Sequence, residues 1–261
     1  MDPSDLPTKE ELQRKTPGTK RKIGISFAIM NNFKGAIETL ESVKTMHDIQ
    51  LYLHPQWRHQ IPLAAAWNKT AKMAFADGCD YALVCNDDIL FAPDTIDAMV
   101  REYERLRSEK VIMVTPNNIK GELADPYHIL DYALPEGTVT SFSDHPNFSC
   151  FLIAPEYFTE IGDFDENFWP AWFEDNDSHR RAKLLGYREI CTTAAPMVHF
   201  GGVSTSMMDN PDSSGSRDYY IKKWGGVPWP ESEVFTTPYN DPNLTPKDWL
   251  VGGPGGIPHV V

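Results

Sequence analysis

The first half of this 261-residue chain alternates between short apolar runs and longer segments in which apolar residues recur every three or four positions. The short runs, which have the length of strands, lie at residues 23–30, 49–53, 81–85 and 111–115. The segments with helical spacing lie at residues 35–46, 63–77 and 94–106. Strands that are joined through helices pair in parallel, and helices then cover both faces of the sheet. We therefore predict an α/β fold with a mostly parallel sheet flanked by helices.

The composition of the chain changes on both sides of this alternating region. Residues 1–20 are polar and rich in charge, so we predict a flexible leader that precedes one domain over residues 21–225. Residues 116–148 lack either pattern and are predicted to form an irregular insertion, of the kind that often binds ligands. Residues 226–261 hold 7 of the 21 prolines, which predicts an extended tail that packs on the domain.

The overall charge excludes some classes of function. The chain has 37 acidic and 24 basic residues and a formal net charge of -13, which argues against a general binder of nucleic acid or of anionic membranes. Its four cysteines show no paired spacing, which favours a reducing, cytoplasmic compartment. No apolar run has the length of a signal peptide or a membrane span, so we expect a soluble protein.

Three polar residues, Asn86, Asp87 and Asp88, interrupt the apolar run over residues 81–91. A solvated turn between a strand and a helix would explain them on the local sequence alone. However, an ionised carboxylate removed from water costs several kcal/mol unless a cation or hydrogen-bond donors meet it. In parallel sheets, ligands bind beyond the carboxyl ends of the strands, where these residues fall. This position favours a binding site.

A second acidic cluster, which contains Glu174, Asp175 and Asp177, begins a helical segment. Acids in the first turn of a helix are favoured by about 0.3–1 kcal/mol each, so they could serve only to stabilise the helix. That explanation does not account for Trp169 and Trp172, which crowd the same stretch. Aromatic rings beside carboxylates form a surface suited to a sugar ring or a base.

His199 ends an apolar run and is followed by two glycines. A lone histidine in this position is more often a satisfied core or surface residue than a ligand. Here the glycines would let the backbone approach a bound molecule closely. Aspartate oxygens with an imidazole and a diphosphate would suit Mg²⁺ or Mn²⁺.

The order and spacing of four motifs resemble a GT-A glycosyltransferase of the large family 2 type, over about residues 23–203. The motifs are LVCNDD (83–88), IGDFDENF (161–168), FEDND (173–177) and VHFGG (198–202). The resemblance implies a GT-A, Rossmann-like fold with the insertion on the acceptor side. It also implies a metal-dependent, inverting transfer of sugar from a nucleotide-diphosphate donor, with a UDP-type donor favoured.

The resemblance assigns the donor side to the first acidic motif. Asp88 would bind Mn²⁺ or Mg²⁺, Asp87 would contact the ribose or the donor sugar, and His199 would be a further metal ligand. Asn86 stands where relatives carry the first acid of an Asp-x-Asp motif, which leaves fewer charges to hold the metal.

The resemblance assigns the acceptor side to the second acidic motif. Asp175 would be the general base, and Glu174 would orient the acceptor. Trp169, Trp172 and Asp177 would belong to the surrounding substrate-binding surface.

Two further parts of the predicted donor site are the segment after the second strand, which differs from relatives, and a pair of lysines that lies outside the four motifs. Relatives carry an aspartate after the second strand that reads the nucleotide base, whereas this chain has LHPQWR at 53–58, so Trp57 or Arg58 would take that role. Lys222 and Lys223 would close over the diphosphate, although a pair of solvated lysines explains them equally well.

Two other functions remain open at this point. A sugar nucleotidyltransferase would need a basic, glycine-rich loop after the first strand, and residues 28–35 offer one glycine and one lysine. A non-catalytic sugar- or nucleotide-binding module predicts a missing base, yet Glu174 and Asp175 are both present. The acceptor hydroxyl could belong to a glycan, a lipid-linked sugar or a protein, and the acidic charge disfavours a modified DNA base.

Overall fold

The computed structural model describes residues 19–206 and 212–224. The predicted leader lies outside the described residues except for Thr19 and Lys20, and the predicted tail lies outside them entirely. The division into leader, domain and tail therefore stays a prediction.

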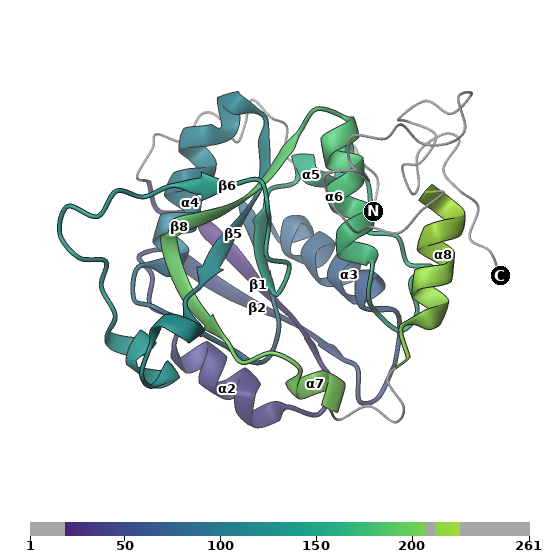
Figure 1. The fold of residues 1–261 in the computed structure, drawn as a ribbon, viewed down its shortest axis with the longest axis horizontal. Coiled ribbons are helices and arrows are strands. Elements are labelled where there is room, and N and C mark those ends of the chain that lie inside the picture. The colour runs from purple at the N-terminus through teal and green to yellow at the C-terminus, as the bar shows by residue number, and fades with distance from the viewer. Residues whose placement is uncertain (1–18, 207–211, 225–261) are drawn as a thin grey trace.

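A sheet of eight strands occupies the centre of the part of the chain that the structure describes, in the order β2-β1-β3-β7-β5-β8-β4, with β6 paired to β8 (Figure 1). The strands are β1 (Lys22–Ile29), β2 (Asp48–Pro55), β3 (Tyr81–Cys85), β4 (Ile89–Phe91), β5 (Val111–Asn118), β6 (Phe142–Ser143), β7 (Cys150–Ile153) and β8 (Arg188–His199). The helices are α2 (Phe33–Glu41), α3 (Leu63–Ala76), α4 (Thr95–Leu106), α5 (Glu156–Glu160), α6 (Glu174–Leu184), α7 (Val203–Ser206) and α8 (Ser214–Trp224).

The five longest strands all run in one direction. Strand β1 is parallel to β2 and β3, and β5 is parallel to β8. Strand β7 is antiparallel to both β3 and β5, which gives those two strands the same direction. The α/β class with a mostly parallel sheet is thus confirmed. Strand β7 follows the irregular insertion and is not joined to β5 by a crossover helix.

Apolar side chains cover both faces of the sheet. On one face, residues of β1 and β3 pack with α4, and Ile96, Met99 and Tyr103 are fully buried. On the other face, Trp67 of α3 and Phe164 pack with residues of β3 and β7. Burial on both faces accounts for strands that read as continuous apolar runs rather than as alternating ones.

The insertion over residues 116–148 is irregular, as predicted. Beyond the end of β5 it contains two 3₁₀ turns, Lys120–Glu122 and Pro126–Asp131, and the two-residue strand β6. Ile129 is fully buried and anchors the insertion to the sheet.

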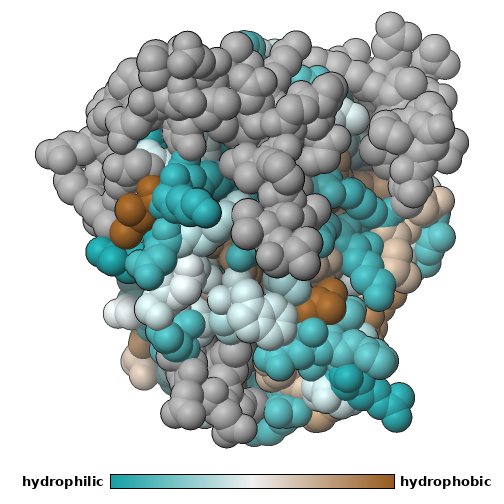
Figure 2. Space-filling model, turned by 90° about the vertical axis from the view of Figure 1, so that its right-hand side faces the viewer, coloured by the Kyte–Doolittle hydropathy of each residue, from teal (hydrophilic) through white to brown (hydrophobic). Residues whose placement is uncertain are grey.

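Helix α8 is held to the rest of the domain by a buried charge cluster. The ammonium of Lys223 lies 2.6 Å from Asp165 Oδ2 and 2.7 Å from Asp177 Oδ1, and all three side chains are almost fully buried. Trp224 Nε1 donates to Asp177 Oδ1 at 2.8 Å, and Arg181 Nε donates to Asp177 Oδ2 at 2.9 Å. Figure 2 shows the face that carries α8, whose described surface is mostly hydrophilic. Tyr220 and Trp224 of α8 are buried against the domain.

No helix among residues 19–206 and 212–224 combines the length and the apolar character that crossing a membrane requires.

Candidate functional site

The pairing of β4 with β8 brings the first acidic motif next to the predicted histidine. Ile89 is the register partner of His199, so Asp88, the residue before β4, lies beside the end of β8. Asp88 Oδ1 is 3.1 Å from His199 Nε2. The backbone N–H groups of Phe200 and Gly201 donate to the carbonyl and to Oδ2 of Asp88 at 3.0 and 3.1 Å. These contacts hold the Asp88 carboxylate beside the imidazole of His199.

A side-chain contact holds Asn86, and a hydrogen bond to its backbone carbonyl holds Asp87. The Asn86 amide nitrogen Nδ2 lies 3.4 Å from His199 Nε2. The carbonyl of Asp87 accepts a hydrogen bond of 2.7 Å from Asn32 Nδ2, and Asn32 also caps helix α2 by accepting from the N–H of Gly35. A Cβ atom at Gly35 would lie 2.3 Å from the Asp87 carbonyl oxygen, so only glycine allows this approach.

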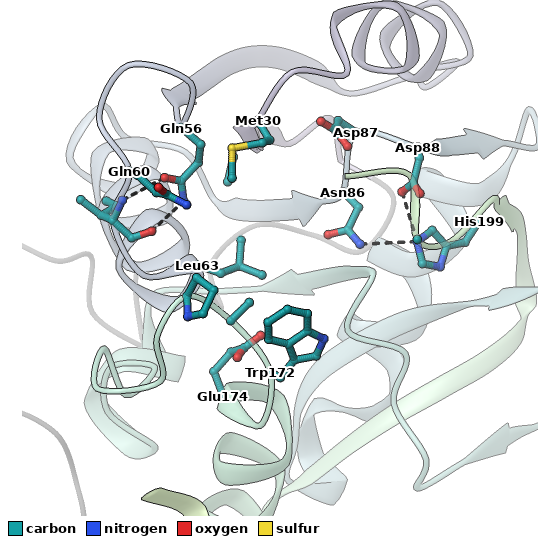
Figure 3. A pocket seen from close by; sticks show the side chains of 15 residues that line it. Met30, Gln56, Gln60, Leu63, Asn86, Asp87, Asp88, Trp172, Glu174 and His199 are labelled. Carbon is teal, nitrogen blue, oxygen red and sulfur yellow. Dashed lines mark hydrogen bonds and ion pairs between the residues drawn. The ribbon is translucent and has the colours of Figure 1, made fainter. Parts of the chain in front are cut away.

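Asn86, Asp87, Asp88 and His199 form one wall of a cavity of about 290 Å³. Figure 3 shows Asn86, Asp88 and His199 together, with Trp172 and Glu174 on a second wall and Gln56, Gln60 and Met30 on a third. The cavity is lined by Ala28, Met30, Gln56, Gln60, Ile61, Leu63, Asn86, Asp87, Asp88, Pro170, Ala171, Trp172, Glu174, His199 and Gly202. No lysine or arginine stands among these lining residues.

Glu174 begins helix α6 and reaches this cavity in a buried position. Its side chain is 4% exposed, and Oε2 has no hydrogen-bond partner among the described residues. Burial raises the pKa of Glu174 well above its ordinary value, and the neighbouring charges of Asp175 and Asp177 raise it further. The carboxyl group is therefore predominantly protonated over a wider pH range than in water.

Asp175 lines a second cavity of about 390 Å³ that adjoins the first. The two cavities share Leu63, Asn86, Glu174 and His199. The second cavity is otherwise lined by Trp67, Pro146, Asn147, Phe148, Ser149 and Asp175. His199 and Glu174 therefore lie where the two cavities join, with Asp88 in the first cavity and Asp175 in the second.

The other predicted substrate-binding residues lie in different surroundings. Trp172 lines the first cavity, whereas Trp169 is 50% exposed and lines neither cavity. Asp177 is fully buried in the cluster that holds α8, where it binds Arg181 and Lys223. Its position makes it a structural partner of α8.

The predicted lysines also lie away from the cavities. Lys223 is bound by Asp165 and Asp177 in the interior, and Lys222 is exposed at the end of α8. Burial alone would raise the pKa of Asp165, but the Lys223 charge and the hydrogen bonds around the carboxylate lower it to about 2. Neither lysine lines the cavity wall that carries Asp88.

The loop after β2 presents residues that the sequence interpretation missed. Trp57 packs edge to face on Phe33 with ring centroids 4.9 Å apart, and neither Trp57 nor the exposed Arg58 lines the cavity. Gln56 and Gln60 line it instead. Both amide atoms of Gln56 bond to the backbone of Ile61 at 3.0 Å, which closes the loop. The only feature of the sequence that could have indicated Gln56 and Gln60 is that they lie next to the position where relatives carry the base-reading aspartate.

The residues around Asp88 fit a hard divalent cation that completes its shell from a substrate. Within residues 19–206 and 212–224, no three His, Cys, Asp or Glu side chains converge into a metal-binding group. Asp88 and His199 nevertheless offer an oxygen and a nitrogen on one cavity wall. Mg²⁺ is commonly held by one or two carboxylates together with substrate phosphates and water.

We expect Glu174→Gln to raise the melting temperature at pH 7 by about 2 °C or more, because the amide removes the cost of a buried charge. The ordinary pKa of 4.5 holds in the unfolded chain, and the folded value is higher. Above pH 4.5 the unfolded chain loses the Glu174 proton while the folded chain keeps it, so stability falls as the pH rises from 4.5 towards the folded pKa, and this loss is absent below 4.5.

Thermal denaturation of the wild type and the variant between pH 4 and 8 checks this. The difference should disappear at the acidic end. The exposed Glu136 provides a control, and Glu136→Gln should leave the melting temperature unchanged across the range. A Glu174→Gln variant that is less stable at pH 7 would contradict the expectation.

No protein-family model matches the sequence. A galactofuranosyl glycosyltransferase of Leishmania donovani is 29% identical over 92 residues, which are 35% of this chain and 19% of that protein. The matched segment is therefore less than a fifth of the length of that relative.

Two examples represent the solved structures that share the fold. GalNAc-T7 with UDP, GalNAc and Mn²⁺ aligns with a TM-score of 0.52 and 12% identity, over 86% of this chain and 53% of the other. A mutant of Drosophila β1,4-galactosyltransferase 7 with manganese, UDP-Gal and xylobiose aligns with a TM-score of 0.50 and 13% identity, over 87% and 83%. The chain has the GT-A fold of glycosyltransferases, as its four motifs predict.

Proposed function

We propose that this protein is a metal-dependent, inverting glycosyltransferase that moves a sugar from a UDP-type nucleotide sugar to an acceptor hydroxyl. One observation carries the proposal. Asp88 and His199 lie 3.1 Å apart on one wall of a cavity whose facing wall carries Glu174, and Asp175 lies in the adjoining cavity (Figure 3). The GT-A fold supports it, and the aligned structures hold manganese with UDP or UDP-Gal.

The charge of the cavity supports metal dependence. Two carboxylates, of Asp87 and Asp88, line the first cavity, and no lysine or arginine does so among the described residues. A nucleoside diphosphate carries at least two negative charges and would be repelled by this lining. Asp88 and His199 would hold a divalent cation, which when bound would neutralise the departing diphosphate.

The acidic pair of α6 supports the acceptor side of the proposal. Asp175 would take the proton of the acceptor hydroxyl while that oxygen forms a bond to the anomeric carbon and the bond from that carbon to the diphosphate breaks. Attack on the face opposite the diphosphate inverts the configuration. Glu174 lines both cavities and would orient the hydroxyl. Phe148 gives the second cavity an aromatic wall suited to a sugar-like acceptor.

A donor panel tests the proposed reaction. The protein is incubated with UDP-, GDP-, CDP- and TDP-sugars, with and without Mn²⁺, and the released nucleoside diphosphate is measured. UDP-linked galactose, as pyranose and furanose, belongs in the panel because the matched proteins are named for galactosyl and galactofuranosyl transfer. We expect Mn²⁺-dependent release of UDP. Release of pyrophosphate from nucleoside triphosphate and sugar phosphate would instead indicate a nucleotidyltransferase.

Asp88→Asn is expected to abolish the Mn²⁺-dependent rise in melting temperature that UDP causes in the wild type. The rise should be about 5–10 °C at UDP concentrations near 100 times its Kd, because a ligand at that excess stabilises the fold by about 2.7 kcal/mol. The amide retains an acceptor for the Gly201 N–H but loses the charge. The exposed Asp131 provides the control, and Asp131→Asn should keep the full shift. An unchanged shift in Asp88→Asn would remove Asp88 from the metal site.

A further inference from the structure

The segment of residues 169–173 forms part of the first cavity wall in a strained backbone conformation. Pro170, Ala171 and Trp172 line the cavity, and Figure 3 shows Trp172 beside Glu174. Trp172 and Phe173 have φ angles of +73° and +71°, in the left-handed region that side chains other than glycine rarely adopt. Such a residue persists only when its surroundings hold it.

Helix α6 does not hold this segment by itself. Phe173 is the N-cap residue of α6 and makes no side-chain capping hydrogen bond. The Pro170 carbonyl accepts a hydrogen bond of 3.0 Å from the N–H of Leu63, at the start of α3. At the other end of the segment, the Phe173 carbonyl accepts a hydrogen bond of 2.9 Å from the N–H of Asp177 in α6. The carbonyls of Trp169 and Ala171, between these two points, are bound by α8.

Ser216 of α8 binds the segment at two points. Its side-chain hydroxyl lies 3.0 Å from the carbonyl oxygen of Trp169 and 2.9 Å from that of Ala171, and it donates to both in a bifurcated hydrogen bond. Ser216 is 1% exposed and lies outside both cavities. One turn further along α8, Tyr220 packs on the ring of Phe173 with centroids 5.6 Å apart.

Helix α8 is in turn anchored to α6. Lys223 and Trp224 both bind Asp177, which lies two residues after Asp175 on α6. Helix α8 therefore contacts both the cavity wall at residues 169–173 and helix α6, which carries Glu174 and Asp175. A displacement of the wall by about 1 Å can cost on the order of 10²-fold in rate when it moves a reacting group.

We propose that Ser216 is a positioning residue for the transfer reaction, which fixes the backbone of residues 169–173 and so places Trp172 and the helix start that carries Glu174 and Asp175. This inference rests on the proposed function. Ser216 lines neither cavity, so its removal should affect the rate of the chemical step more than the binding of donor.

Ser216→Ala tests this role, with Ser42→Ala as the matched control. Ser42 is also buried, and its hydroxyl donates to Thr39 O and accepts from the N–H of Phe91, away from both cavities. For hydrolysis of the UDP-sugar cleaved fastest in the donor panel, Ser216→Ala should lower kcat about 10-fold or more. The KM for that donor and the UDP-Mn²⁺ melting shift should stay within about twofold.

A readout independent of activity accompanies the kinetics. Amide hydrogen exchange over residues 172–177 should become about fivefold faster in Ser216→Ala, as expected for loss of one hydrogen bond, and unchanged in Ser42→Ala. Ser216→Thr keeps the hydroxyl and should recover most of the rate.

Two results would overturn the inference while the proposed function stands: wild-type kcat in Ser216→Ala, or an equal loss of kcat in Ser42→Ala. A wild-type protein that neither hydrolyses any UDP-sugar nor shows the UDP-Mn²⁺ shift would remove the proposed function, and the inference with it.

Discussion

Asp175→Asn should reduce sugar transfer and donor hydrolysis by at least about 10²-fold, as is typical when a general base is lost. The amide cannot accept the proton of the incoming hydroxyl, although it has the same shape as the carboxylate. Its oxygen can still accept the 2.7 Å hydrogen bond that the N–H of Asn176 donates to Asp175 Oδ1. The local structure of α6 should therefore persist, and the UDP-Mn²⁺ melting shift should match that of the wild type.

Asp163 provides a control for the loss of a carboxylate near this site. It is half-buried, pairs with Lys72 and lines neither cavity. Asp163→Asn should keep near-normal turnover. Near-normal turnover in Asp175→Asn, together with an inactive Glu174→Gln, would transfer the role of base to Glu174, which lines both cavities.

The part of the site that follows strand ends could be predicted from the sequence. Asp88 follows an apolar run, and His199 closes another. Because β3 and β8 run in the same direction, their carboxyl ends meet at one edge of the sheet. The approach of Asp88 to 3.1 Å from His199 additionally needs the short antiparallel strand β4, which the helical and strand periodicities do not reveal.

The parts that depend on loop closure or on distant charge pairing could not be predicted. Gln56 points into the loop after β2 because its amide closes onto the backbone of Ile61, and this leaves Trp57 on the Phe33 ring. From the sequence, Lys223 is predicted either to close over the diphosphate or to lie in solvent beside Lys222. Only the packing of α8 against α6 shows that it is enclosed by carboxylates.

The same packing predicts that Lys223→Met will lower the free energy of unfolding by about 3–5 kcal/mol, the usual cost of removing one partner from a buried ion pair. Methionine fills similar space but leaves Asp165 and Asp177 with one fewer cation in the interior. Arg181 remains beside Asp177, so Asp165 bears most of the loss. Adding Asp165→Asn to Lys223→Met should restore part of the stability, because the amide removes the uncompensated charge. Urea denaturation at pH 7 measures all three proteins.

Acid should reduce this difference between Lys223→Met and the wild type. The folded pKa of Asp165 is about 2 and its ordinary value is 3.8, so the ionised carboxylate stabilises the wild-type fold above pH 3.8. That contribution falls as the pH drops through 3.8 towards 2, where protonated Asp165 no longer needs Lys223. Lys223→Met lacks the contribution at every pH, so the two denaturation midpoints should converge as the pH falls from 4 towards 2. A constant gap from pH 7 to 2 would mean that the methionine acts through lost packing around α8 and not through the broken ion pair.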